Sequence, residues 1–126
     1  MNAPLLLMTL FLVKHFLADF PLQQHGSMKG SRVFTEWVPD LLLHCQVHVA
    51  LTALIVLVMD LPDRLGAFVI GADFVLHFII DRIKAHPDLG GRWKPNQKAF
   101  WVALGLDQLA HGLCYVAYVH VLTGGR

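Results

Sequence analysis

Eight ionisable residues of the sequence form four pairs, and the two members of each pair are four positions apart. The pairs are His15 with Asp19, His44 with His48, His77 with Asp81, and Asp107 with His111. Residues with this spacing lie on one face of an α-helix, about 6 Å apart along its axis. Imidazole and carboxylate groups are common protein ligands of Zn, Mn and Fe. The pattern therefore predicts four helices that each carry two potential metal ligands.

The number of these side chains bears on how many ions they would hold. Five His and three Asp residues exceed the four ligands of one tetrahedral zinc site. They would suit two ions about 3.5–4 Å apart, or one ion whose ligands are oriented by further polar groups. We expect all eight residues to act as ligands or to support the ligands. The expected cofactor is a divalent metal, Zn first, with Mn and Fe as alternatives.

The helices that carry these pairs are predicted to lie in a membrane. Hydrophobic residues make up 56% of the 126 residues and charged residues only 15%, and the mean hydropathy is +0.54. A soluble domain of this size needs a more polar surface, because it can bury only part of its area. The length favours one domain, and the net charge of +1 argues against a nucleic-acid partner.

Four segments approach the length of about 20 residues that an α-helix needs to cross a bilayer. They are residues 3–22, 41–59, 65–84 and 100–122, and Pro39 with Asp40 is the expected start signal of the second. The first segment lacks a basic leader region and a cleavage motif, so it is expected to be retained. We therefore expect an all-α, four-helix membrane bundle formed by a single transmembrane domain, residues 1–126.

Basic residues predict the orientation of this bundle. Seven of them belong to the first and third connections, and two to the opposite side: Lys29, Arg32, Arg82, Lys84, Arg92, Lys94 and Lys98 against Arg64 and Arg126. Cytoplasmic loops carry the excess of Lys and Arg. We expect a multi-pass protein of the inner membrane, with both termini outside and the four pairs in the cytoplasmic half of the bundle.

Three further features of the sequence bear on how the polar residues are arranged. The segments His15-Phe-Leu-Ala-Asp19 and His77-Phe-Ile-Ile-Asp81 are near copies, which favours two duplicated helical hairpins. Asp73 is expected either to extend the polar face of His77 or to pair with Lys14. Gln108 is expected to point elsewhere on its helix and to make a structural hydrogen bond.

The copied segments also carry a family resemblance. The stretches His15-Phe-Leu-Ala-Asp19-Phe-Pro-Leu-Gln23 and His77-Phe-Ile-Ile-Asp81-Arg-Ile-Lys84 resemble hallmarks of the domain of unknown function 3307 (DUF3307) family of bacterial and phage integral membrane proteins. Lys29 and His44 fit the family's loop lysine and second-helix histidine. The resemblance covers nearly the whole chain and implies a fold rather than an activity. More distantly, the chain resembles the membrane-bound metal-dependent hydrolases.

The leading functional hypothesis is metal-dependent hydrolysis of a membrane-embedded or membrane-proximal substrate, such as a lipid phosphoester. A bound ion would activate water, Asp107 is the candidate general base, and Lys84 or Lys29 would bind an anionic substrate. The lipid bilayer is the expected partner, and an oligomer is left open.

Three alternatives remain. A small channel or carrier could relay protons or ions through the His and Asp side chains. A non-catalytic membrane interaction protein could use them for helix–helix hydrogen bonding, which explains each pair alone as well as metal binding does. Haem ligation by paired histidines fits the adjacent-turn His residues and the many Asp residues poorly.

Overall fold

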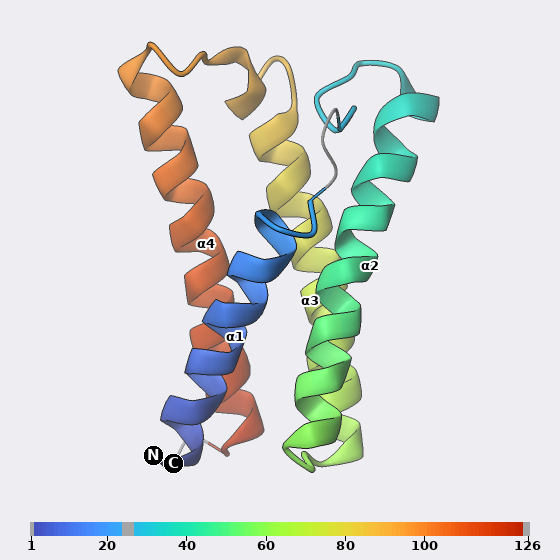
Figure 1. Ribbon diagram of the computed structural model, residues 1–126, viewed down its shortest axis with the longest axis vertical. Helices are drawn as coiled ribbons and strands as arrows, with labels where there is room; N and C mark the ends of the chain where they lie inside the picture. Colours follow the sequence, from blue (N-terminus) through green and yellow to red (C-terminus); the bar gives the residue numbers. More distant parts are fainter. Residues whose placement is uncertain (1, 24–26, 125–126) are drawn as a thin grey trace.

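The computed structural model describes residues 2–23 and 27–124, and every regular element in these residues is a helix. The elements are α1 (Ala3–Asp19), α2 (Phe34–Val58), α3 (Asp63–Ala85), the short 3₁₀ helix η1 (Gly90–Arg92) and α4 (Lys98–Leu122). Consecutive α-helices run in opposite directions and pack side by side, and α4 packs against α1 (Figure 1). The expected all-α four-helix bundle is confirmed.

The helix ends differ from the expected positions for local reasons. α1 ends at Asp19 rather than at residue 22, because Pro21 has no backbone N–H to donate to the oxygen of Leu17. That oxygen accepts from the backbone N–H of Leu22 instead, at 3.0 Å. α2 begins at Phe34 rather than at residue 41, and Pro39 lies inside it. A proline near the start of a helix removes only one backbone hydrogen bond, so α2 continues through it.

The bundle has two unlike ends. The start of α1, the end of α4 and the short turn between α2 and α3 lie at one end, which we call the terminal end, and the two long connections lie at the other, the loop end (Figure 1). A Cβ atom on Gly66 would lie 2.5 Å from Cγ1 of Val56, so this glycine lets α2 and α3 approach closely near the turn. Arg126 lies outside the described residues.

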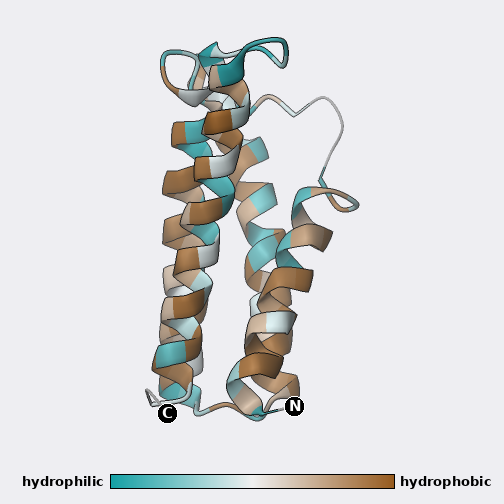
Figure 2. Cartoon of the chain, turned by 90° about the vertical axis from the view of Figure 1, so that its left-hand side faces the viewer, coloured by the Kyte–Doolittle hydropathy of each residue, from teal (hydrophilic) through white to brown (hydrophobic). Residues whose placement is uncertain are grey.

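The outer surface of the helices is apolar. Leu57, Val58 and Phe68 are 77%, 70% and 62% exposed. Figure 2 shows hydrophobic residues over most turns of the helices and hydrophilic residues at the loop end. Among the described helices, α2 and α4 are long and apolar enough to cross a membrane. Only 33% and 28% of their most apolar windows is buried, unlike the core helix of a soluble protein.

The interior divides into an apolar and a polar half. Towards the terminal end it contains a hydrophobic cluster of Leu7, Phe11, Ile55, Val69, Tyr115, Tyr118, Val119 and Leu122. Buried polar and charged residues from all four helices occupy the interior beyond this cluster: Lys14, His15, His44, His48, Thr52, Asp73, His77, Asp81, Asp107 and His111. The middle of the bundle thus buries these ionisable groups while many leucines of the helices are exposed, the reverse of a soluble domain.

Candidate metal centre

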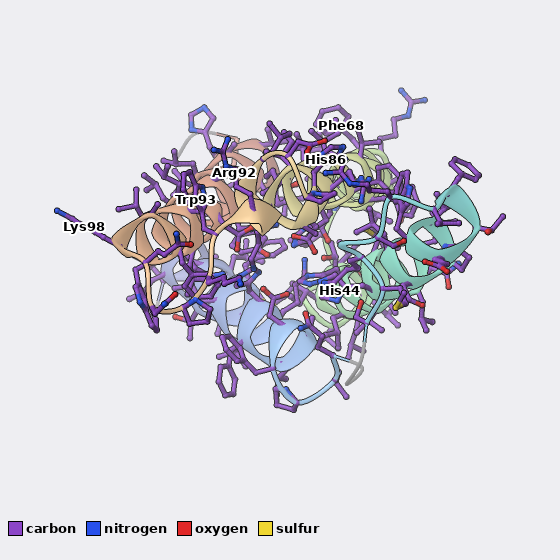
Figure 3. All side chains as sticks on the ribbon, turned by 90° about the horizontal axis from the view of Figure 1, so that it is seen from above. His44, Phe68, His86, Arg92, Trp93 and Lys98 are labelled. Atoms are coloured by element: carbon purple, nitrogen blue, oxygen red, sulfur yellow. The ribbon has the colours of Figure 1, made fainter. Side chains whose placement is uncertain are left out.

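All eight side chains selected from the sequence meet inside the bundle. Seven of them are buried and Asp19 is half-buried. Seen from the loop end, His44 points towards the centre of the bundle, whereas Lys98 points away from it (Figure 3). The antiparallel helices therefore bring the pairs to a common level, as their positions in the sequence predict.

Asp19 of α1 joins its own helix to α2. Its Oδ1 atom lies 2.9 Å from Nε2 of His48 and 3.3 Å from Nε2 of His44. Its Oδ2 atom lies 3.2 Å from Nε2 of His15. Asp19, His44 and His48 can each offer a ligand atom, and these atoms all lie within 4.8 Å of one another.

Asp81 of α3 forms a second meeting point and links α2 to α4. Its Oδ2 atom lies 2.9 Å from Nε2 of His44, and its Oδ1 atom lies 3.4 Å from Nε2 of His111. Asp107 contributes Oδ1, which lies 3.6 Å from Nδ1 of His111. Because His44 contacts both Asp19 and Asp81, the two groups form one continuous centre.

Several ligand atoms of this centre lack hydrogen bonds within the described residues. They are Nε2 of His44, Nδ1 of His48, Oδ1 of Asp107 and Nε2 of His111, all of them buried. Nε2 of His44 and Nε2 of His111 lie close to the carboxylate of Asp81, but neither nitrogen is aligned with its oxygens for a hydrogen bond. Buried polar atoms in proteins are nearly always hydrogen-bonded. A convergent set of unsatisfied nitrogen and oxygen atoms is what a bound cation requires, so the residues fit a metal.

A third group, His15, His48 and His77, is oriented by Tyr115. The Tyr115 hydroxyl lies 2.8 Å from Nδ1 of His15 and 3.2 Å from Nε2 of His77. Nδ1 of His77 is 3.0 Å from the backbone oxygen of Asp73, to which it must donate, so a neutral His77 accepts at Nε2. Tyr115 then donates to His77 and accepts from Nδ1 of His15. In this arrangement Nε2 of His15 faces two acceptors, Oδ2 of Asp19 and Oε1 of Gln108, each at 3.2 Å.

Asp73 anchors this chain of hydrogen bonds. Its Oδ2 atom accepts from Nζ of Lys14 at 2.6 Å and from the hydroxyl of Thr52 at 2.7 Å. Its Oδ1 atom lies 3.1 Å from Nδ1 of His77. Both roles considered for Asp73, a partner of Lys14 and an extension of the His77 face, are therefore present together.

The two residues predicted to be catalytic contact each other at the loop end of the centre. Nζ of Lys84 lies 2.9 Å from Oδ2 of Asp107. Lys29 approaches the same centre from the first connection, and its Nζ lies 3.7 Å from Oδ2 of Asp81. Each of these two carboxylates therefore has a lysine beside it.

Arg82 holds the first connection so that Lys29 reaches the centre. It donates a hydrogen bond from Nη1 to the backbone oxygen of Lys29 at 2.8 Å. Its guanidinium carbon lies 3.9 Å from the centre of the Trp37 ring, a cation–π contact. A segment without regular structure is thereby held over the polar interior.

Sequence reasoning missed Tyr115 and Thr52 and misplaced Gln108. The Gln108 side chain does not point elsewhere, because its Oε1 atom lies 3.2 Å from Nε2 of His15. A signal for the other two was present: Thr52 follows His48, and Tyr115 follows His111, by the same four positions that separate the pairs. The polar faces of α2 and α4 are therefore one turn longer than their candidate ligand pairs.

Comparison with known proteins identifies a family and no characterised relative. A family model described as "Protein of unknown function (DUF3307)" matches residues 7–125. No curated protein and no solved structure matches the chain.

Proposed function

The chain belongs to the DUF3307 family, and we propose that it is an integral membrane protein that binds a divalent metal and hydrolyses an anionic substrate in or near the bilayer. The observation that carries the proposal is the convergence on Asp81 of Nε2 of His44, at 2.9 Å, and Nε2 of His111, at 3.4 Å. Neither nitrogen makes a hydrogen bond in the described part of the chain. Two imidazoles and a carboxylate from three helices are a common ligand set for catalytic zinc.

Membrane insertion of the whole bundle is supported by the distribution of polarity. Ionisable groups within a bilayer face the bundle interior and pair with one another, and the buried His, Asp and Lys side chains follow that rule. The exposed leucines, valines and phenylalanines form a surface far more apolar than soluble monomers carry. We propose that all four helices span the inner membrane, with both termini outside.

Hydrolysis is supported by the groups around the ligands. A divalent metal in this centre would polarise the substrate and lower the pKa of water. Asp107 keeps one carboxylate oxygen without a hydrogen bond, so it can accept a proton from water. Lys84 and Lys29 lie beside Asp107 and Asp81 and would turn to an anionic substrate once a cation neutralises those carboxylates.

A proton or ion channel is a weaker candidate. The polar side chains occupy the loop-end half of the interior, and the hydrophobic cluster that includes Leu7, Phe11 and Val69 fills the terminal-end half. A conducting path through one bundle would have to cross this cluster. The described residues therefore provide polar side chains for a proton or ion path in only one half of the interior.

The proposal is tested by elemental analysis of the protein purified in detergent. We expect stoichiometric Zn, Mn or Fe in the wild type and loss of most of it in His44→Ala and His111→Ala. His120→Ala is the matched control, because His120 is an exposed histidine of the same helix as His111 and should leave the metal content unchanged. Circular dichroism verifies that each variant is helical.

The proposed hydrolysis is tested separately, by an activity assay. Metal-loaded wild type should release inorganic phosphate from phosphatidic acid, a lipid phosphomonoester, and Asp107→Asn should lower the rate by about 10²–10⁴-fold, as for loss of a general base. A folded wild type without metal would overturn metal binding. A metal-loaded protein inactive on phosphatidic acid would overturn phosphomonoester hydrolysis but not the metal centre.

A further inference from the structure

An apolar groove runs between α3 and α4 and ends at the candidate metal centre. It has a volume of about 260 Å³, and Ile80, Ile83, Leu106 and Ala110 form much of its wall. Lys84 and Asp107 are its polar members. Ile83 and Leu106 are 52% and 60% exposed, so the groove opens on the outer side of the bundle.

A second, polar pocket adjoins this groove at the loop end. It has a volume of about 270 Å³, and its polar lining includes Gln23, Lys29, Asp81 and Lys84. Lys84 and Gly90 border both cavities. The groove and the pocket therefore meet at the Lys84 side chain, and together they have one cationic and one apolar part.

Gly90 makes this junction possible. A Cβ atom at this position would lie 2.5 Å from the backbone oxygen of Lys84, closer than real Cβ contacts. The glycine thus lets η1 pack directly against the end of α3. Close packing there keeps the loop beside Lys84.

We propose that the groove and the pocket form one binding site for a lipid that carries a phosphate group, with an acyl chain between α3 and α4. This inference rests on the proposed function and names its substrate class. The phosphate group lies between Lys84 and Lys29, where ammonium groups can donate charge-assisted hydrogen bonds. The acyl chain covers Ile83, Leu106 and Ala110, which otherwise face outward.

A lipid is favoured over a soluble phosphate because the two cavities adjoin, with Lys84, Gly90 and Ala103 in the walls of both. A soluble phosphate would use only the pocket and would leave the apolar groove without a role. A lipid would enter sideways from the bilayer, so its phosphate would reach Lys84 without crossing the loops. The phosphate group would then lie beside Asp107 and Asp81, both of which line these cavities.

The test uses the metal-loaded protein in phosphatidylcholine nanodiscs that contain a non-hydrolysable phosphonate analogue of phosphatidic acid with a photoreactive diazirine in its acyl chain, because the proposed activity would consume phosphatidic acid itself. After irradiation, mass spectrometry locates the labelled residues. We expect labelling at Ile83, Leu106 and Ala110, and much less from a phosphatidylcholine with the same diazirine chain. Lys84→Met should reduce labelling by at least about tenfold, as for loss of a charge-assisted hydrogen bond. Lys98→Met is the control, since Lys98 points away from the bundle (Figure 3).

A second variant tests the groove itself. Ala110→Phe fills the groove and should suppress its labelling, whereas Ala117→Phe makes the same change at an exposed position of α4 and should not. A circular dichroism spectrum like that of the wild type shows that each variant keeps its fold.

Labelling that is equal for the two lipids, or spread evenly around the bundle, would overturn the lipid site. A protein that holds metal but lacks groove labelling would overturn this inference alone. Selective groove labelling of a protein that binds no metal would support the lipid site and overturn the proposed function.

Discussion

Tyr115 fixes the orientation of two imidazoles of the candidate metal centre, His15 at 2.8 Å and His77 at 3.2 Å. Outer hydrogen bonds of this kind set which ring nitrogen faces the metal. We predict that Tyr115→Phe lowers the metal affinity by about 10–100-fold, measured by competition with a chelating dye. Tyr118→Phe is a matched control, because the buried Tyr118 hydroxyl has no hydrogen-bond partner in the described residues. Equal affinities of the two variants would contradict the orienting role.

Lys14 and Asp73 form a buried ion pair behind the ligands, with Nζ and Oδ2 2.6 Å apart and exposures of only 3% and 0%. Removing one member leaves the other charge buried alone, which costs about 3–5 kcal/mol. We predict that Lys14→Met loses stability of this order in a detergent unfolding titration. The double variant Lys14→Met with Asp73→Asn should recover much of the loss, because no unpaired charge remains. A double variant no more stable than Lys14→Met would contradict this explanation.

At the scale of the residue, the sequence predicts the candidate ligands better than the groups that orient them. The spacing of four identified His44, Asp81 and His111 because imidazole and carboxylate side chains are uncommon inside apolar helices. Tyr115 and Thr52 share the spacing but resemble ordinary packing residues by type. Which nitrogen of His15 faces the centre depends on a hydrogen-bond chain across α1, α3 and α4, and no single helix encodes it.

Among the elements, the helices follow from the sequence and the connections do not. The apolar segments and the level of the ligand pairs depend on periodicity, which is local. α2 begins at Phe34 and continues through Pro39, so this proline does not mark the start of the helix. The reach of Lys29 depends on Arg82, a residue of α3 that bonds to the backbone of the first connection. Such long-range contacts leave no periodic pattern.

The close packing of the 3₁₀ helix η1 against the end of α3 can be tested by substitution. A Cβ atom on Gly91 would lie 2.3 Å from the backbone oxygen of Ala85, and neither backbone can move without separating η1 from α3. We predict that Gly91→Ala lowers the free energy of unfolding by about 1–3 kcal/mol, the usual cost of overpacking. Thermal unfolding in detergent measures it.

Gly105→Ala is the control for that substitution. A Cβ atom at Gly105, inside α4, has no other atom within 4 Å, and alanine favours a helix over glycine by up to about 1 kcal/mol. The variant should therefore be as stable as the wild type or more stable. If Gly91→Ala behaved like Gly105→Ala, close packing of η1 would not matter for the fold.

The whole molecule is organised by two separations of polarity. Across the bundle, ionisable groups lie inside and leucines and valines outside; along it, polar residues lie towards the loop end and the hydrophobic cluster towards the terminal end. The first separation suits a lipid environment. The second means that, in the described residues, the polar interior reaches the loop end, where Lys29 and Lys84 line a pocket, and the hydrophobic cluster separates it from the terminal end. This arrangement suits the proposed enzyme, which would meet its substrate at one membrane surface.

The orientation of the molecule follows from its basic residues and can be measured. Seven Lys and Arg residues lie in or beside the long connections and Arg64 beside the short turn, so the loop end should face the cytoplasm. Variants of a protein with Cys45→Ala and Cys114→Ala would carry one new cysteine each. A membrane-impermeant maleimide should label Asp63→Cys in intact cells and Asn96→Cys only after permeabilisation, because Asp63 begins α3 and Asn96 lies in the connection between η1 and α4. The reverse pattern would put the pocket outside the cell, and labelling of both in intact cells would contradict a spanning bundle.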